Sequence, residues 1–214
     1  MKKSGRYRTS ELVEDSFEPG SRGRVLQNKL GITGKRAMDE VEAREQFRAL
    51  SYFLEEYDRD HRFTAQDICR MHEIWLGPVY EWAGNYRQVN IMKGGFPFAM
   101  ARQVPVLMEQ LEVGPLHNHT PCRAEGHEEI IHAVAVVHAE LVLIHPFREG
   151  NGRLARMLAV LMGLQAGLPP FDFGGLKGRQ RQRYFAAVQA GLAENYTPME
   201  QVFRSVLRRT VQRG

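Results

Sequence analysis

Two long apolar segments, joined by a short polar loop, limit the fold of this chain more than any other feature. Residues 128–144 read EEIIHAVAVVHAELVLI, which is apolar on nearly every side of a helix. Residues 153–167 read RLARMLAVLMGLQAG, where apolar residues recur at helical spacing. Because a helix that is apolar all round must be buried, we predict that these two helices form the centre of the core. The polar loop between them then lies at their ends.

The remaining segments also favour helices. The spacing in EVEAREQFRALSYFLEEY predicts an amphipathic helix with Phe47, Leu50, Phe53 and Leu54 on one face. Thr64 is a candidate N-cap for a second helix, TAQDICRMHEIWL. The strand signal is confined to residues 89–99, where a Gly-Gly turn between two short apolar runs predicts a small β-hairpin. The fold class expected is therefore mainly α.

Length and composition indicate one globular domain preceded by an arm. The chain has 214 residues, of which 43% are hydrophobic and 25% charged, enough for one sizeable core. Residues 1–22 are polar and end in EPGSRG, which is typical of an arm with a turn, so the domain is expected over residues 23–214. Cys69 and Cys122 have no metal-ligand spacing and are expected to be unpaired, reduced thiols.

Neither a membrane span nor a signal peptide is expected. The segment MLAVLMGLQAGLPPF contains a glutamine, two glycines and two prolines and is too short to cross a bilayer. The start, MKKSGRYRTSELVED, lacks an apolar stretch of signal-peptide length. We therefore expect the protein in the cytoplasm, although a secretion signal of another type needs no such stretch.

The net charge of +4 raises the question of nucleic acid as a partner. The basic clusters, at residues 177–183 and 203–213, interleave no aromatics in a nucleic-acid motif, so such binding is not expected. A modest basic balance also suits a polyanionic small molecule. The sequence HEEIIH at 127–132 is not expected to bind zinc, because its histidines are one residue too far apart for the helical i, i+4 pattern.

The loop itself, with the start of the next helix, reads HPFREGNGRLAR over residues 145–156. Backbone N–H groups at a helix start have no intrahelical partner and attract anions such as phosphate. Gly150 and Gly152 let the backbone approach closely, and the Asn151 amide can donate to the same anion. Arg153 and Arg156, three residues apart on one helix face, add two planar guanidinium groups suited to a chain of phosphates.

Two further residues complete the chemistry of this loop. Glu149 offers a carboxylate where a polyphosphate would need magnesium, an ion that proteins hold with one or two carboxylates and phosphate oxygens. His145 is the side chain of the set suited to take up a proton near neutral pH. The loop therefore combines a base, a metal ligand and a phosphate-binding surface.

HPFREGNGRLAR is similar at every specified position to the signature of the Fic family, His-x-Phe-x-Asp/Glu-Gly-Asn-Gly-Arg-x-x-Arg. VLQNKLGI at 25–32, YEWAGNYRQVNI at 80–91 and KGGFPFA at 93–99 resemble its first helix, pre-hairpin segment and flap. The resemblance covers about residues 25–209. It implies a Fic-type helical bundle in which a small β-hairpin flap lies beside the active-site loop.

The resemblance also implies a reaction, the transfer of AMP from Mg-ATP to a Ser, Thr or Tyr hydroxyl of a target protein. In that case His145 deprotonates the hydroxyl, Glu149 holds Mg²⁺ and Phe147 anchors the loop. Tyr184 is a candidate adenine contact, with a structural aromatic role as the alternative. The remaining implied residues bind phosphate (Gly150, Asn151, Gly152, Arg153, Arg156) or form the flap that docks the target (Lys93, Gly94, Gly95, Phe96).

Other functions stay open. A Doc-like protein kinase would transfer the γ-phosphate, but that subgroup has a lysine where this chain has Gly152. A transferase that uses another nucleotide donor is compatible with the motif, because the motif recognises phosphates better than bases. A non-catalytic binding module would be favoured if the base or the metal ligand were missing, and neither is.

The resemblance finally raises the question of inhibition. Proteins of this family are commonly held inactive by a helix with Ser/Thr-x-x-x-Glu-Gly/Asn, whose glutamate pairs with the second motif arginine, here Arg156. SELVED at 10–15 ends in Asp15, and AGLAEN at 190–195 begins with Ala190, so neither fits fully. We therefore expect a separate small helical antitoxin as a partner, with this chain as the toxin of a bacterial toxin–antitoxin pair.

Overall fold

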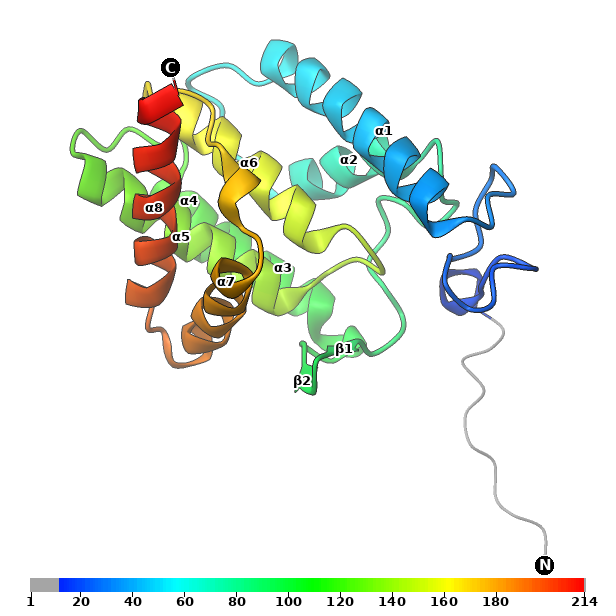
Figure 1. Cartoon of the computed structure of the whole chain (residues 1–214). Helices are drawn as coiled ribbons and strands as arrows, with labels where there is room; N and C mark the ends of the chain where they lie inside the picture. Colours follow the sequence, from blue (N-terminus) through cyan, green and yellow to red (C-terminus); the bar gives the residue numbers. More distant parts are fainter. Residues whose placement is uncertain (1–11, 214) are drawn as a thin grey trace, which may run out of the picture.

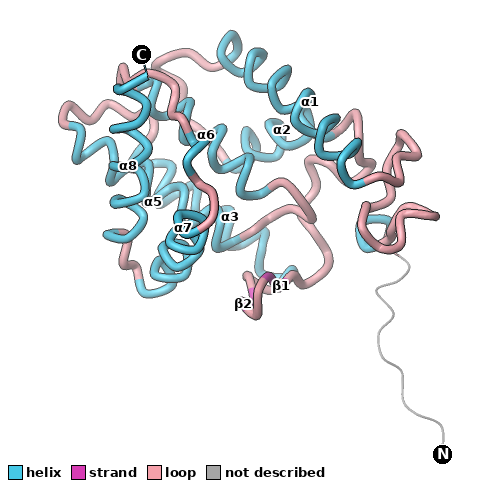
Figure 2. Tube along the Cα trace, in the orientation of Figure 1, coloured by secondary structure: helices cyan, strands magenta, loops and turns pink. Residues whose placement is uncertain are grey.

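The computed structural model describes residues 12–213 as a predominantly helical body (Figures 1 and 2). The longer helices are α1 (Lys35–Glu56), α2 (Ala65–Leu76), α3 (Val104–Leu111), α5 (His127–Ile144), α6 (Asn151–Gln165), α7 (Arg179–Ala190) and α8 (Thr197–Arg213). The shorter ones are α4 (His117–His119), the 3-10 turns Val13–Asp15, Ala101–Gln103, Phe173–Gly175 and Gly191–Ala193, and a π-helical turn, Glu112–Leu116. The expectation of a mainly α fold with one small hairpin is confirmed.

Helices α5 and α6 lie at the centre of the body, as the apolar segments predict. Helix α5 packs against α3, α6, α7 and α8, and nearly all of its residues from Ile130 to Ile144 are buried. Helices α1 and α2 pack on each other at one side, with α2 against α6 (Figure 1). The N-terminus of α6 therefore lies between the two groups of helices. Within residues 12–213 we find no helix long and apolar enough to cross a membrane.

The prediction for the face of α1 is wrong in part. Phe47 is 76% exposed and Leu54 is 49% exposed, whereas Phe53 is fully buried. The buried residues of α1 are Met38, Glu42, Ala49 and Phe53, which recur at helical spacing along a different stripe. Helix α2 packs on that stripe. The buried face of α1 thus includes a charged residue, Glu42, which bears on the site described below.

The starts of α2 and of the hairpin follow local chemistry. Thr64 caps α2 in a capping box, where its side chain accepts from the Asp67 N–H and the Asp67 carboxylate accepts from the Thr64 N–H. Strand β1 (Met92–Lys93) pairs antiparallel with β2 (Phe96–Pro97), with Lys93 opposite Phe96. Gly94 and Gly95 both have positive φ, as the tight two-residue turn between such strands requires. The strands are shorter than the predicted span of residues 89–99.

Candidate active site

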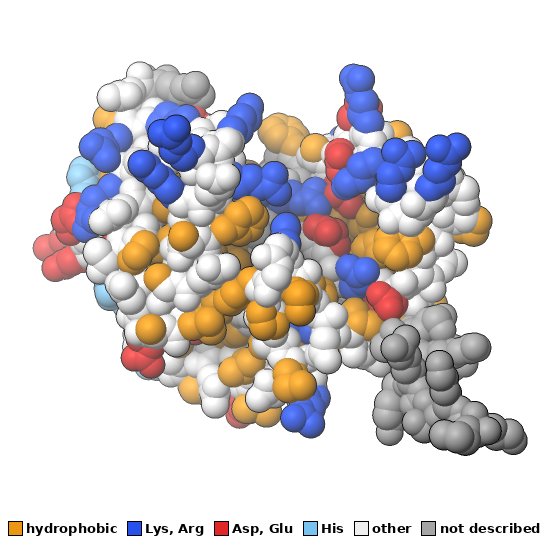
Figure 3. Space-filling model, turned by 60° about the horizontal axis from the view of Figure 1, so that its bottom comes forward, with side chains coloured by type: hydrophobic (Ala, Val, Ile, Leu, Met, Phe, Trp, Pro, Cys, Tyr) orange, Lys and Arg blue, Asp and Glu red, His pale blue; other side chains and the backbone are white. Residues whose placement is uncertain are grey.

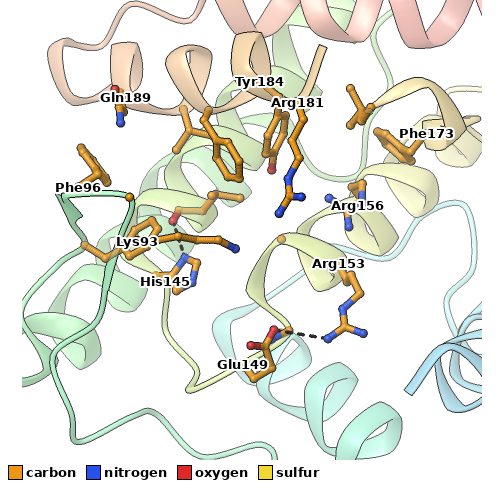
Figure 4. A pocket seen from close by; sticks show the side chains of 18 residues that line it. Lys93, Phe96, His145, Glu149, Arg153, Arg156, Phe173, Arg181, Tyr184 and Gln189 are labelled. Carbon is orange, nitrogen blue, oxygen red and sulfur yellow. Dashed lines mark hydrogen bonds and ion pairs between the residues drawn. The ribbon is translucent and has the colours of Figure 1, made fainter. Parts of the chain in front are cut away.

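A cavity of about 540 Å³ lies where the α5–α6 loop, the start of α6, the hairpin and α7 meet (Figure 4). This volume is within the range usual for small-molecule sites. Figure 3 shows a hollow in this part of the surface, with Lys and Arg side chains around it and acidic side chains at one side. The lining residues come from four segments: Lys93, Gly94, Phe96, Phe98; Val142, His145, Glu149, Gly150, Gly152, Arg153, Arg156; Phe173, Leu176; Arg181, Tyr184, Phe185, Val188, Gln189.

The loop between α5 and α6 is closed by Asn151. The Asn151 amide donates to the Phe147 carbonyl at 2.7 Å, and its oxygen accepts from the Phe147 N–H at 2.9 Å. Asn151 is 2% exposed and does not line the cavity. The Phe147 carbonyl takes one of the two N–H donors of this amide, so the predicted donation to a phosphate by the other stays a prediction. Phe147 is fully buried, and the His72 ring stacks on its ring with the centroids 3.9 Å apart.

The start of α6 requires glycine at position 150. Gly150 has φ +85°, and a Cβ there would lie 2.8 Å from Cζ3 of Trp75. Its carbonyl accepts from the N–H groups of Arg153 and Leu154 at 2.9 Å, which starts the helix without a side-chain cap. The first N–H groups of α6 are therefore left for an external anion. At Gly152 a Cβ would lie 3.7 Å from a terminal nitrogen of Arg156 and 3.9 Å from the Tyr184 hydroxyl, which is ordinary van der Waals contact.

His145 ends α5 in a left-handed conformation (φ +53°) and directs its imidazole into the cavity (Figure 4). Its Nδ1 lies 3.1 Å from the Val142 carbonyl, which can only accept, so Nδ1 carries the proton and Nε2 the lone pair. Burial, with Arg87 and Lys93 nearby, lowers the pKa of His145 to about 4. At neutral pH the imidazole is thus a neutral proton acceptor at Nε2.

Arg87 holds the end of α5 and the hairpin together. Its guanidinium, 2% exposed, donates from Nε to the His145 carbonyl at 2.7 Å and from one terminal nitrogen to the Val89 carbonyl at 2.7 Å. The other terminal nitrogen donates to carbonyls of Ile144 and Ala99. A cation at a helix C-terminus satisfies carbonyls that the helix leaves unpaired. Arg87 therefore positions His145 relative to the hairpin.

Glu149 faces the cavity from the loop. Its Oε1 accepts from the Gly150 N–H at 2.8 Å and lies 3.4 Å from a terminal nitrogen of Arg153. Desolvation acts to raise its pKa, but the Gly150 hydrogen bond and the cations Arg153 and Lys93 keep the pKa below its usual value. The carboxylate is therefore ionised at neutral pH. Across residues 12–213, no three His, Cys, Asp or Glu side chains come together as a metal-binding group.

Arg153 is held from three sides. One terminal nitrogen lies 2.8 Å from Oε2 of Glu42, the other is near Glu149, and the guanidinium lies 4.8 Å above the Trp75 ring. The Glu42 side chain is 2% exposed, and its Oε1 accepts from the Tyr80 hydroxyl at 2.6 Å. Trp75 in turn donates from its indole N–H to the Glu42 carbonyl at 2.9 Å.

Arg156 has a neutral partner instead. Its side chain donates to the Tyr184 hydroxyl, and Tyr184 donates in turn to Nε2 of His138 at 2.9 Å. The Ala155 carbonyl, 3.1 Å from Nδ1 of His138, fixes the proton on that nitrogen. Burial lowers the pKa of His138 to about 3, so the ring is neutral and accepts from Tyr184. Tyr184 thus supports Arg156, which fits the structural role given as the alternative, and it also lines the cavity, so that the adenine contact stays a prediction.

The hairpin forms the opposite wall. Lys93 reaches into the cavity, with its ammonium 5.6 Å from the centre of the Phe185 ring, and Gly94 and Phe96 also line the cavity (Figure 4). Gly95 belongs to the turn but not to the lining. The residues expected at the flap are thus next to those of the loop, as the resemblance implies.

Sequence reasoning missed four residues that position the site: Glu42, His72, Arg87 and His138. A signal existed for Glu42, because Met38, Glu42, Ala49 and Phe53 share one helical stripe, and a carboxylate on an apolar stripe is expected to have a buried partner. His138 also stands in a segment that is apolar all round. No local pattern distinguishes His72 or Arg87.

Comparisons with known proteins agree with this geometry. Residues 62–162 match the model of the Fic/DOC family. The chain is 29% identical to protein adenylyltransferase fic-1 of Caenorhabditis elegans over 217 residues, which cover 97% of this chain and 40% of that protein. It is 30% identical to protein adenylyltransferase VbhT of Bartonella schoenbuchensis over 143 residues, or 67% of this chain and 30% of VbhT. The chain therefore spans less than half the length of these two relatives.

Solved structures show the same fold. The BepC effector protein of Bartonella tribocorum, crystallised with bound AMPPNP, superposes with a TM-score of 0.67 at 25% identity, covering 85% of this chain and 91% of BepC. A Fic domain of a cell filamentation protein from Bartonella quintana, with bound ADP, gives a TM-score of 0.67 at 27% identity. It covers 85% of this chain and 89% of that one.

Proposed function

Since this chain belongs to the Fic/DOC family, we propose that it is a protein adenylyltransferase that moves AMP from Mg-ATP to a Ser, Thr or Tyr hydroxyl of a target protein. Relatives that carry the name protein adenylyltransferase support the reaction class, and nucleotide-bound neighbours support ATP as the donor. The observation that carries the proposal is the neutral His145 imidazole, which faces the same cavity as Glu149 and the start of α6.

The step assigned to His145 is proton removal. Nε2 takes the proton of the target hydroxyl, whose oxygen forms a bond to the α-phosphorus of ATP. The bond from that phosphorus to the oxygen that bridges to the β-phosphate breaks, and pyrophosphate leaves. A positioned base of this kind contributes about 10²- to 10⁴-fold to the rate. Most of the remaining acceleration comes from holding the phosphates and balancing their charge.

The α6 start and the two arginines are assigned to the phosphates. The first backbone N–H groups of α6, before Arg153, and the guanidinium groups of Arg153 and Arg156 lie beside the cavity, where a phosphate chain would bind. A single ionised carboxylate beside phosphates fits Mg²⁺, which takes one or two carboxylates and keeps the phosphate oxygens as further ligands. When bound, this ion neutralises phosphate charge. Glu149 is the residue that would hold it.

The hairpin is assigned to the target. Both strands of the two-stranded sheet are short and largely exposed, so an extended segment of a target can pair with a free edge through its backbone. Because Phe98, just past β2, stacks on the His145 ring, such a segment would pass close to the base. Backbone pairing leaves the choice of target open.

The test uses ATP labelled at the α- or the γ-phosphate, with purified protein and a mixture of candidate targets. We expect transfer of the α-label only, and no transfer with His145→Ala. Label arriving from the γ-phosphate alone would establish a kinase and overturn the proposal. Glycine at position 152, where the kinase subgroup has lysine, favours the adenylyltransferase. Competition by other nucleoside triphosphates in the same assay tests for a different donor.

We also propose that this chain is a bacterial toxin, acting in the cytoplasm and inhibited by a separate small helical antitoxin. Within residues 12–213, no ion pair joins Arg156 to a glutamate, and its side chain bonds to Tyr184 instead. Glu14 instead accepts from the Gln88 N–H at 2.7 Å, and Asp15 lies 3.5 Å from Arg148. Ser10 and Glu11 of the candidate motif lie outside the described residues.

The other internal candidate, Glu194, follows the Gly191–Ala193 turn and is exposed. Growth on expression of the chain alone tests the idea. We expect toxicity that His145→Ala relieves, with the same toxicity for Glu14→Gly and Glu194→Gly. A harmless parent that becomes toxic only with Glu14→Gly or Glu194→Gly would show that the inhibitor lies within this chain.

A further inference from the structure

The buried carboxylate of Glu42 has no evident structural purpose on α1. It lies on the stripe that α1 buries, beside Met38, Ala49 and Phe53. Removing a carboxylate from water costs free energy that only close partners offset. The partners here are the Tyr80 hydroxyl at Oε1 and the Arg153 guanidinium at Oε2, and of these two Arg153 lines the cavity.

The contact between Glu42 and Arg153 is an ion pair rather than an aligned hydrogen bond. The two atoms are 2.8 Å apart, but Oε2 of Glu42 receives no N–H in hydrogen-bond geometry. Trp75 lies beneath the same guanidinium and donates to the Glu42 carbonyl, so one set of contacts fixes both residues. Arg153 is thereby held in one orientation, although it is a long side chain at the edge of a cavity.

Arg153 also hydrogen-bonds to a second acid, Glu149, through its other terminal nitrogen at the longer distance of 3.4 Å. Each carboxylate thus takes a different nitrogen of one guanidinium, and because Glu42 holds the first nitrogen, Arg153 makes only this single long contact with Glu149. If Glu42 were uncharged, Arg153 would be free to turn fully toward Glu149 and form the two-pronged pair that arginine and carboxylate favour. Glu149 would then be neutralised and less available to a cation.

We propose that Glu42 is a positioning residue that draws Arg153 away from Glu149, so that Glu149 remains free for a divalent cation while Arg153 faces the phosphates. The proposal rests on the proposed function for the identity of the ligand, Mg-ATP. Arg156 needs no such counter-charge, since its partner Tyr184 is neutral. The two motif arginines therefore differ in role: Arg153 is oriented by charge, and Arg156 by a neutral hydroxyl.

The test measures ATP binding in the His145→Ala background, so that no transfer takes place. Binding is measured with Mg²⁺ and with EDTA. The ratio of the two dissociation constants is the gain in ATP affinity due to Mg²⁺, called the gain below. Glu42→Gln keeps the size of the side chain and its bond from Tyr80. We expect it to reduce the gain about tenfold, the loss of one positioned charge contact, while binding in EDTA changes little.

Two controls separate positioning from folding. Glu45→Gln removes another acid of α1 that pairs with Arg48 at 2.8 Å outside the cavity, and it should leave the gain unchanged. In an Arg153→Gln background, Glu42→Gln should have no further effect on the gain, because the residue on which it acts is gone. In the parent with His145 intact, Glu42→Gln should lower kcat about 10- to 100-fold, as expected for a misplaced group.

Three outcomes would overturn the proposal. An unchanged gain together with a lower melting temperature would make Glu42 a structural residue only. A gain that rises in Glu42→Gln would make Glu42 a competitor of the nucleotide. An equal loss in the Arg153→Gln background would show that Glu42 does not act through Arg153. If the parent binds ATP but transfers no AMP, only the proposed function fails, whereas no binding of ATP overturns both.

Discussion

The imidazole of His145 lies flat on the ring of Phe98, with centroids 3.7 Å apart and planes 17° from parallel. The two residues belong to different walls of the cavity, one at the end of α5 and one just past β2. This stack, with the Nδ1 contact to the Val142 carbonyl, leaves Nε2 as the nitrogen able to accept a proton. The hairpin therefore helps to orient the His145 imidazole.

Replacing Phe98 by leucine removes the flat ring but keeps an apolar side chain. We expect kcat for AMP transfer to fall about tenfold or more, because small misplacements of a reacting group are costly. Mg-ATP binding should stay within a few-fold, which calorimetry checks. Met100→Leu, an exposed change nearby, is the control. Equal effects of the two variants on kcat would contradict an orienting role for Phe98.

The roles of His145 and Glu149 are separable by binding. His145→Ala should abolish transfer and leave the affinity for Mg-ATP within a few-fold, since the base contacts the target hydroxyl. Glu149→Ala should weaken the Mg²⁺-dependent part of binding. Titration of each folded variant with ATP and Mg²⁺ measures both. Complete loss of nucleotide binding in folded His145→Ala would leave the general-base role without support.

The pH dependence of transfer should reflect the lowered pKa of His145, about 4. A base must be unprotonated, so its activity is present above its pKa and is lost as pH falls through that value. We expect kcat/KM for the target, at saturating Mg-ATP, to change little from pH 8 to about 5. An ordinary histidine would instead lose half its activity near pH 6.5. A midpoint near 6.5 would show that burial does not control this group.

Stability should fall with acid through His138. Its pKa is lowered to about 3 in the folded state, from an ordinary value near 6.5. Between these two values the unfolded chain binds the additional proton, so the free energy of unfolding decreases as pH falls below about 6.5. Each such histidine contributes a slope of up to about 1.4 kcal/mol per pH unit. Urea unfolding at pH 7, 6 and 5 gives the slope of the free energy of unfolding against pH, which should be shallower for His138→Gln than for the parent. An identical slope would contradict the prediction.

The two hydrogen bonds between the Asn151 side chain and the Phe147 backbone should stabilise the folded protein as well as support its function. Asn151→Ala leaves the buried N–H and carbonyl of Phe147 without partners, at a cost of about 1–3 kcal/mol. Urea unfolding measures the loss. Asn118→Ala, at an exposed position of α4, should change the free energy of unfolding by less than about 0.5 kcal/mol. Equal free energies of unfolding for the two variants would contradict a stabilising role of these two hydrogen bonds.

Elements that depend on a local sequence pattern could be predicted from the amino-acid sequence. The apolar periodicity of α5 and α6, the Thr64 cap and the Gly94-Gly95 turn depend on neighbours within a few residues, and all are found where they were expected. The same holds for the placement of the motif, because a loop between two buried helices must end at the start of the second. The match to a fixed pattern of polar residues then indicated the chemistry.

The charged and hydrogen-bonding partners of the residues around the cavity are known only from the three-dimensional structure. The buried face of α1 follows from the helix that packs on it, so Phe47 is exposed and Glu42 is buried. Asn151 bonds to Phe147 because the loop folds back on itself. The protonation of His145 depends on burial and on Arg87, and the orientation of Arg153 on Glu42. Charge, burial and hydrogen-bond direction act through space, so spacing along the chain does not reveal them.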